Sequence, residues 1–360
     1  MAKKTVFSGK VEFVQVLDKD GKADKTLLPK LSKEELKQLY RWMVFARIAD
    51  EKCLKLQRAG RIGTFAQILG QEAQVGVALA LKKNDWLVPS FRENALIWAL
   101  GAKAEDIYQL FGGFEKGQQF SGLNILPISV PVGTHPLHAV GIAWAFKLRN
   151  EKKVVATFFG DGATSEGDFH EALNFASVFQ VPCVFFCQNN QYAISVPRKK
   201  QSHAQTLAQK GLAYGMDGIQ VDGNDVLAVY RVARTAIEKA RFGGGPTLVE
   251  LVTYRMADHT TADDATKYRT KTEVEYWKKR DPILRMQHYL KTKRLWTEKW
   301  EDTLGIQIRS QIEKSVQIYE ALSQPQVGEM FDFLFEKKTP ELEQQKNKLQ
   351  NWKNQEEGKV

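Results

Sequence analysis

Residues 158–197 read FFGDGATSEGDFHEALNFASVFQVPCVFFCQNNQYAISVP, and this stretch decides the fold class. An apolar run over 154–159 enters the turn GDG at 160–162, and an amphipathic segment follows. A second apolar run over 181–187 ends in QNN at 188–190. The order strand, turn, helix, strand is typical of a parallel α/β sheet, in which ligands bind where the strand ends meet.

The residues at these two strand ends predict a divalent metal that holds a phosphate. Asp161 supplies a hard carboxylate and Asn190 a neutral amide oxygen. Gly160 and Gly162 allow the backbone to approach a ligand closely. Mg²⁺ prefers oxygen ligands and is usually shared with the phosphates of a substrate or cofactor.

Length and composition predict a globular α/β protein. The 360 residues are 43% apolar and 26% charged, and they suffice for one large domain with extensions. The sequence holds no apolar run of about 18 residues and no apolar signal-peptide core near its start, so we expect a cytoplasmic protein. Cys53, Cys183 and Cys187 lack the spacing of a zinc site and are expected to pack in the core.

The net charge of +10 raises an alternative class, a basic protein that binds nucleic acid or serves as a scaffold. The basic residues do not cluster, however, and they alternate with acidic ones, as in KKRD at 278–281. This distribution favours a solvated surface, or attraction to acidic ligands and partners.

The chain is expected to form three regions. Residues 1–30 form an N-terminal arm, residues 31–270 an α/β domain with a mobile loop at 254–270, and residues 271–360 a C-terminal helical extension. Ser32 and Glu35 have the spacing of a capping box, which predicts a helix that stops at Gly60. A further charged helix is expected over residues 338–360, and a helix beginning at His138 follows the proline-containing loop 125–138.

Two positively charged positions outside the opening stretch are candidate ligand contacts. Arg92 stands where a short strand gives way to a helix, a place from which arginine can grip a phosphate. A surface ion pair with Glu93 or a neighbour is the alternative. In the loop 254–270, His259 and Arg269 could contact a phosphate or a developing oxyanion, whereas composition alone favours a solvated connector.

The combination of GDG and NN resembles the motif that binds thiamine diphosphate through Mg²⁺. Further segments, GQEAQVGVALAL, PSFRENALIWALG and YRMADHTTADDATKYR among them, resemble the α subunits of 2-oxo acid dehydrogenases over roughly residues 30–290. Within that family the chain is most similar to the α subunit of bacterial pyruvate dehydrogenase. The resemblance implies a thiamine-diphosphate-binding fold, with a central parallel sheet flanked by helices.

The resemblance also assigns roles to individual residues. Asp161, Asn190 and the backbone carbonyl of Tyr192 match the Mg²⁺ ligands. The positions that match cofactor contacts are Phe91, Arg92, Val130, Val132, Asp161, Gly162, Ala163, Asn190, Tyr192 and His259. Phe91 stands where relatives often carry tyrosine, so a hydroxyl contact is absent there.

Other positions match loop and ion sites of the family. His259, Tyr268 and Arg269 match the catalytic loop histidine and the ordered end of that loop. Thr260 stands where some relatives carry a phosphorylated serine, and no phosphorylation is predicted from this sequence. Ser129 and Thr134 match potassium-binding positions of branched-chain relatives. At the adjoining position 135 a histidine replaces the usual glutamine, which puts the potassium site in doubt.

The family's activity is the thiamine-dependent oxidative decarboxylation of pyruvate, coupled to reductive acetylation of a lipoyl group on the acetyltransferase component. The resemblance implies that the glutamate activating the cofactor comes from a β subunit in an α2β2 assembly. Glu72 is the other candidate, from this chain itself. A branched-chain 2-oxo acid is the alternative substrate, suggested by EVEYWKKRDPILRMQHYL at 273–290 and by ISVPVGTH at 128–135. A thiamine decarboxylase that acts without a partner usually needs a longer chain.

Overall fold

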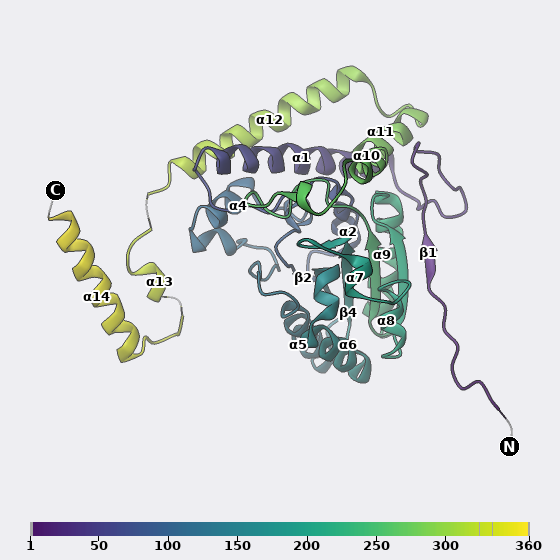
Figure 1. The fold of residues 1–360 in the computed structure, drawn as a ribbon, viewed down its shortest axis with the longest axis horizontal. Helices are drawn as coiled ribbons and strands as arrows, with labels where there is room; N and C mark the ends of the chain where they lie inside the picture. Colours follow the sequence, from purple (N-terminus) through teal and green to yellow (C-terminus); the bar gives the residue numbers. More distant parts are fainter. Residues whose placement is uncertain (1–2, 324, 333, 359–360) are drawn as a thin grey trace. The chain divides into compact units, whose positions relative to one another are not determined.

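A parallel sheet forms the centre of the protein (Figure 1). The computed structural model describes residues 3–323, 325–332 and 334–358. Within these residues the central sheet has six strands: β1 (Glu12–Val14), β2 (Trp86–Val88), β3 (Val155–Gly160), β4 (Cys183–Asn189), β7 (Asp217–Asp222) and β8 (Thr247–Val252). They lie in the order β1-β7-β8-β4-β3-β2, and every neighbouring pair is parallel. The predicted fold class is confirmed.

The register of the central strands brings their carboxyl ends to the same level. Gly160 pairs with Gln188 across β3 and β4, and Asn189 pairs with Val252 across β4 and β8. The segments that follow these three strands therefore start side by side. A short antiparallel hairpin, β5 (Tyr192–Ala193) with β6 (Val196–Pro197), comes directly after β4.

Helices pack against this sheet. The helices between the strands are α2 (Val75–Ala80), α3 (Asn94–Ala99), α4 (Ala104–Phe111), α5 (His135–Leu148), α6 (Gly167–Phe179), α7 (Arg198–Gln201), α8 (Gln209–Leu212) and α9 (Val226–Arg241). Helices α5 and α6 lie together (Figure 1), and they share a buried apolar cluster with β3 and β4 that includes Phe159, Phe169 and Phe185. Helix α9 packs on α2 and on β4, β7 and β8. The core is thus continuous across the strands that position the site.

The first long helix, α1 (Lys33–Arg58), begins as the sequence predicts. The hydroxyl of Ser32 accepts from the backbone N–H of Glu35, and the Glu35 carboxylate accepts from the backbone N–H of Ser32, which confirms the capping box. Helix α12 (Glu298–Glu320) runs beside α1 in Figure 1. Tyr40 Oη donates to Glu301 Oε2 at 2.8 Å, and Lys52 pairs with Glu313 at 2.6 Å.

Helix α5 begins at His135, three residues before the predicted start at His138. Pro136 occupies the first turn, where its missing N–H costs nothing and its fixed φ suits a helix. A loop was predicted because proline usually interrupts regular structure. The cysteines pack as expected: Cys53, Cys183 and Cys187 are buried thiols without disulfide partners.

Part of the expected N-terminal arm belongs to the sheet. Strand β1 pairs with β7, and the backbone next to it is fixed by the buried carboxylate of Asp225. Asp225 Oδ2 accepts from the N–H groups of Val16 and Leu17 at 2.7 and 2.5 Å. Its Oδ1 caps α9 by accepting from Leu227 and Ala228 at 3.0 and 3.2 Å. One side chain therefore joins the N-terminal segment to a core helix.

The chain divides into two compact units, residues 1–316 and residues 317–360. In the first unit, α10 (Lys271–Lys278) and α11 (Pro282–Thr292) follow the strands; short 3₁₀ turns lie at Glu72–Gln74, Glu115–Gln118, Asp161–Ser165 and Ala265–Lys267. In the second unit, α13 (Glu329–Asp332) is tied to α14 (Pro340–Glu357) by the ion pair of Lys346 with Asp332, at 2.8 Å. Residues 359–360 of the expected terminal helix lie outside the described residues. Among the described helices, none has the length and apolar character needed to cross a membrane.

Replacing Asp225 with alanine should destabilise the protein by more than about 3 kcal/mol. The change leaves four backbone N–H groups without this acceptor, and a buried unsatisfied donor costs about 1–3 kcal/mol. Urea unfolding of Asp225→Ala measures the loss. Asp217→Ala, which removes an exposed carboxylate of the same strand region, is the control; equal stabilities for the two variants would contradict this account.

Candidate active site

A cavity of about 600 Å³ opens at the carboxyl ends of the central strands. Much of its wall comes from residues after β2 (90–93), from the end of β3 and the turn that follows (160–163), from the end of β4 and the hairpin that follows (188–194), and from residues after β8 (255–260). This is the place where parallel sheets bind ligands, because the strand ends and the following turns leave polar groups exposed there. The cavity is therefore the candidate active site.

Every residue predicted to contact the cofactor lines this one cavity. The group consists of Phe91, Arg92, Val130, Val132, Asp161, Gly162, Ala163, Asn190, Tyr192 and His259. Val130 and Val132 are the exposed members, with 66% and 51% of their surface accessible. The structure thus brings together residues from five separate segments, while the group that each one binds stays a prediction.

Tyr268 and Arg269 do not line the cavity and instead brace the loop. The guanidinium of Arg269 donates to the backbone carbonyls of Arg255 and Met256, the second at 2.9 Å. Tyr268 Oη accepts from Arg255 Nη2 at 2.9 Å and donates to Asp263. Through these contacts Tyr268 and Arg269 order the loop 254–270 without lining the cavity themselves.

Asp161 and Asn190 are the polar pair at the base of the cavity. Both are buried, with 2% and 6% of their surface exposed. Burial raises the pKa of Asp161 to about 6, and the hydrogen bond from Gln201 opposes that rise. A buried carboxylate without a cationic neighbour in direct contact is costly, so the site suits a cation that would neutralise it.

Gly162 follows Asp161 because no side chain fits at this position. A Cβ atom there would lie 2.7 Å from the Cβ of Ala193 in β5. The GDG turn and the hairpin after β4 therefore lie so close together that no side chain fits between Gly162 and Ala193. This close approach is what the GDG turn contributes to the cavity.

Arg92 is buried rather than paired at the surface. Its guanidinium donates to the backbone carbonyl of Gln67 and, at 2.8 Å, to that of His259. Glu93 accepts instead from Gln188 Nε2, at 2.8 Å. The alternative of a surface ion pair of Arg92 is wrong, because Arg92 and Glu93 are both buried and bond other groups.

Burial shifts the pKa values of Arg92 and Glu93 in opposite directions, in each case toward the neutral form. Burial, with the nearby Arg255, lowers the pKa of Arg92 to about 10, and burial raises the pKa of Glu93 to about 7. Two guanidinium groups thus lie close together in a region shielded from water. An anionic ligand in the cavity would relieve their mutual repulsion.

His259 lies between these two guanidinium groups. Its Nδ1 is 3.3 Å from Arg92 Nη2 and 3.4 Å from Arg255 Nη1. Both neighbours are hydrogen-bond donors, so Nδ1 acts as the acceptor and the ring is neutral. Burial, followed by the charges of Arg92 and Arg255, lowers the pKa of His259 to about 4.

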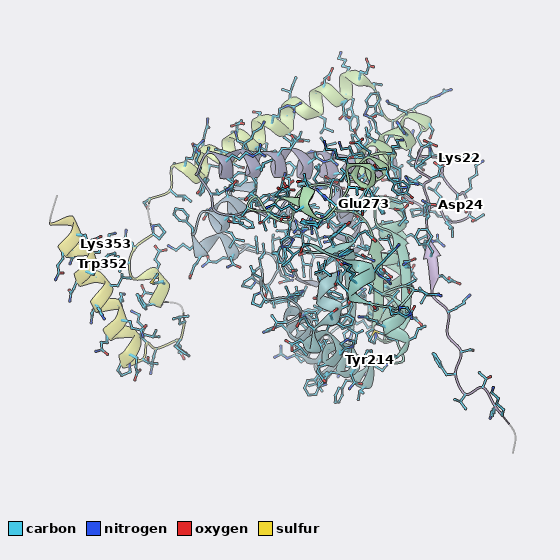
Figure 2. The ribbon with its side chains drawn as sticks, viewed as in Figure 1. Lys22, Asp24, Tyr214, Glu273, Trp352 and Lys353 are labelled. Atoms are coloured by element: carbon cyan, nitrogen blue, oxygen red, sulfur yellow. The ribbon has the colours of Figure 1, made fainter. Side chains whose placement is uncertain are left out.

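Tyr192 connects the cavity to helix α10. Its hydroxyl donates to Glu273 Oε2 at 2.8 Å, and Figure 2 labels Glu273 on that helix. Its backbone carbonyl, a predicted Mg²⁺ ligand, accepts from Arg255 Nη1 at 3.1 Å. The carbonyl has a second lone pair for a cation.

Glu72 does not line the cavity. Its carboxylate accepts from Arg47 Nε at 2.5 Å and from the backbone N–H of Gly70. It is therefore engaged in holding the 70–74 segment. Glu93 and Glu166 are the glutamates that do line the cavity among the described residues.

Among the residues at the site that the sequence does not predict, three form hydrogen bonds with predicted ones: Gln71, Gln201 and Arg255. Gln71 and Arg255 line the cavity, and Gln201 bonds Asp161. Gln71 follows Gly70, whose φ of +91° and close approach to the Tyr254 carbonyl exclude a side chain. The pair Gly70–Gln71, a glycine followed by an amide side chain, was a sequence signal that could have indicated a site residue. Gln201, in the short helix α7, gave none.

Comparison with known proteins finds a matching family and several related chains. Residues 40–328 match the family described as the dehydrogenase E1 component. The chain is 44% identical to the 3-methyl-2-oxobutanoate dehydrogenase subunit alpha of Mycobacterium tuberculosis, over 94% of both chains. It is 40% identical to the pyruvate dehydrogenase E1 component subunit alpha of Staphylococcus epidermidis, over 93% of this chain and 92% of the relative. For the Staphylococcus aureus subunit of the same name the identity is 39%, with the same coverage.

The imidazole of His259 should stay uncharged down to about pH 5. Its pKa lies near 4 in the folded protein, below its ordinary value of about 6.5. Between these two pH values the unfolded chain therefore binds a proton at this histidine and the folded chain does not. This residue's contribution to stability is therefore complete above pH 6.5 and is lost as the pH falls toward 4. Ring C–H signals in NMR, assigned with His259→Gln, report the midpoint. A midpoint at 6.5 would contradict the contacts described.

Proposed function

The chain belongs to the dehydrogenase E1 component family, and we propose that it is the α subunit of the decarboxylating component of a pyruvate dehydrogenase complex. The observation that carries the proposal is the shared cavity of Asp161, Asn190 and Arg92 at the strand ends. A hard carboxylate, an amide oxygen and a guanidinium are the groups that hold a metal and a diphosphate together.

The residues of the cavity fit thiamine diphosphate with Mg²⁺. Asp161 and Asn190 would hold the metal, with the carbonyl of Tyr192 completing the protein ligands. Arg92 and the backbone at Gly162 and Ala163 would hold the diphosphate. Two features support this fit: the Asp161 carboxylate is buried without a salt bridge to another described residue, and a Cβ at position 162 has no room.

Bound thiamine diphosphate supplies the electron sink on which decarboxylation of a 2-oxo acid depends. The residues of this chain would bind the cofactor and orient it. Arg92 would hold the negative charge of the diphosphate, and the backbone at Val130 and Val132 would contact the far end of the cofactor. The neutral ring of His259 can donate a hydrogen bond through Nε2 without adding a third positive charge beside Arg92 and Arg255.

The catalytic carboxylate is proposed to come from a β subunit. Of the glutamates in the cavity wall, Glu93 is occupied by Gln188 Nε2, and Glu166 is exposed at the start of α6. Both oxygens of Glu93 accept hydrogen bonds within this chain, from Gln188 Nε2 and from the backbone N–H of Arg92. We therefore propose an α2β2 assembly, with the loop 254–270 facing the lipoyl domain of the acetyltransferase component.

A branched-chain 2-oxo acid is the second candidate substrate. The relative from M. tuberculosis, named for 3-methyl-2-oxobutanoate, is 44% identical, compared with 40% for the S. epidermidis pyruvate enzyme subunit. The two substrates differ by the branched side chain on the 2-oxo acid, so the size of the pocket made with the β subunit decides between them.

Activity should require the β subunit. Purified alone, this chain is expected to decarboxylate 2-oxo acids negligibly, whereas the reconstituted α and β chains should turn over. Decarboxylation of pyruvate, 3-methyl-2-oxobutanoate and 2-oxoglutarate is measured with and without β. Robust turnover by the isolated chain would refute the shared site, and a preference for 3-methyl-2-oxobutanoate would select the second substrate.

Asp161→Ala should abolish the dependence of thiamine diphosphate binding on Mg²⁺. The change removes the carboxylate from the proposed metal site, and an amide with a carbonyl binds Mg²⁺ poorly by themselves. Calorimetric titration of the αβ complex, with and without Mg²⁺, measures the effect. Asp168→Ala, which removes an exposed carboxylate seven residues later, is the matched control and should bind as wild type does. Unaltered binding by Asp161→Ala would rule out the proposed ligand.

A further inference from the structure

Two glutamine side chains contact the two side chains proposed to bind the metal. Gln71 Oε1 accepts from Asn190 Nδ2 at 3.1 Å, and Gln201 Nε2 donates to Asp161 Oδ2 at 2.7 Å. Gln71 comes from the segment after Gly70, and Gln201 from helix α7. Each metal-binding side chain is therefore held by an amide from a different part of the chain.

The contact with Gln71 fixes which way the Asn190 amide faces. The backbone N–H of Tyr192 donates to Asn190 Oδ1 at 3.4 Å, and Gln71 takes the opposite end, Nδ2. A flipped amide would set two N–H groups against each other at Tyr192, and it would deprive Gln71 Oε1 of its donor. The oxygen of Asn190, which is the end that binds a cation, is thereby kept on the side of the Tyr192 backbone.

Gln71 is itself held rigidly. Only 1% of its surface is exposed, and its backbone carbonyl accepts from Gln74 Nε2 at 3.1 Å. The same Gln74 nitrogen donates to the carbonyl of Arg92 at 3.2 Å, which ties this segment to the strand end that carries the guanidinium. Gln71 Nε2 has no hydrogen-bond partner in the described structure, although Gln71 lines the cavity. The side chain thus keeps an unused donor beside the proposed metal–diphosphate site.

Gln201 holds the carboxylate of Asp161 as Gln71 holds the amide of Asn190. Its Nε2 also donates to the carbonyl of Val196 at 3.2 Å, so the amide is anchored to the hairpin after β4. With Oδ2 occupied by this donor, Oδ1 of Asp161 is the oxygen left for a cation. Gln201 does not line the cavity, so it acts on the carboxylate from behind.

We propose that Gln71 and Gln201 are positioning residues, which hold Asn190 and Asp161 in the orientation that binds the divalent cation. This inference rests on the proposed function, because it assumes a metal between those two side chains. Groups that orient metal ligands from outside typically contribute about 10- to 100-fold to metal affinity. Neither glutamine touches a reacting atom, so each acts through its ligand alone.

The test measures Mg²⁺ affinity in the αβ complex at a fixed concentration of thiamine diphosphate. Gln71→Leu and Gln201→Leu should each weaken Mg²⁺ binding by about 10- to 100-fold, while kcat returns to the wild-type value at saturating Mg²⁺. Gln71→Glu keeps an oxygen facing Asn190 Nδ2 and should restore most of the affinity lost in Gln71→Leu. Thermal melting of each variant without metal establishes that it is folded.

Gln15→Leu is the matched control. It removes a glutamine–carboxylate hydrogen bond of the same 2.7 Å length, from Gln15 Nε2 to Asp222 Oδ2, at the β1–β7 side of the sheet. Its Mg²⁺ affinity should equal that of wild type. Wild-type Mg²⁺ affinity in the two leucine variants, or a kcat that stays low at saturating Mg²⁺, would overturn the positioning role. Failure of the wild-type complex to bind Mg²⁺ and thiamine diphosphate would instead overturn the proposed function.

Discussion

The parallel pairing of β3 with β4 is the constraint on which the site depends. Gly160 and Gln188 are register partners, so Asp161 and Asn190 leave the sheet at neighbouring points. A shift of one residue would turn alternate side chains to the opposite face and separate this pair. The apolar residues of both strands, packed under α5 and α6, enforce the register through the core. The same packing that stabilises the fold therefore sets the distance between the two side chains proposed to bind a metal.

Electrostatics give this site its selectivity for charge. Arg92 and Arg255 are buried close to each other, and each has its pKa lowered, first of all by burial. Asp161 is buried with its pKa raised. The protein thus buries positive groups and a carboxylate in one region of low polarity, where charges without full compensation are unfavourable. A cation at Asp161 and an anion at Arg92 would relieve both, and a metal diphosphate carries the two charges together.

Much of the fold could be predicted from local sequence patterns. The parts that could not be predicted in this way depend on contacts between residues far apart in the sequence. The apolar runs before GDG and QNN predicted β3 and β4, and Ser32 with Glu35 predicted the start of α1. Strand β1 escaped prediction because its partner strand, β7, lies about 200 residues further along the chain. Residue type and position indicated Asp161, Asn190 and Arg92, and resemblance to a family added the other predicted cavity residues. Gln201 and Arg255 were missed, because an amide or guanidinium that supports a neighbour has no local sequence signature, whereas Gln71 was missed although Gly70 precedes it.

The central claim is that Asp161 and Asn190 hold one divalent cation at the meeting point of these strands. The most direct measurement is the anomalous diffraction of Mn²⁺ in crystals of the αβ complex grown with thiamine diphosphate. The account predicts a single strong peak between the carboxylate of Asp161 and the amide oxygen of Asn190, with the cofactor's diphosphate beside it. A peak elsewhere in the cavity, or cofactor density without metal at these two side chains, would contradict it.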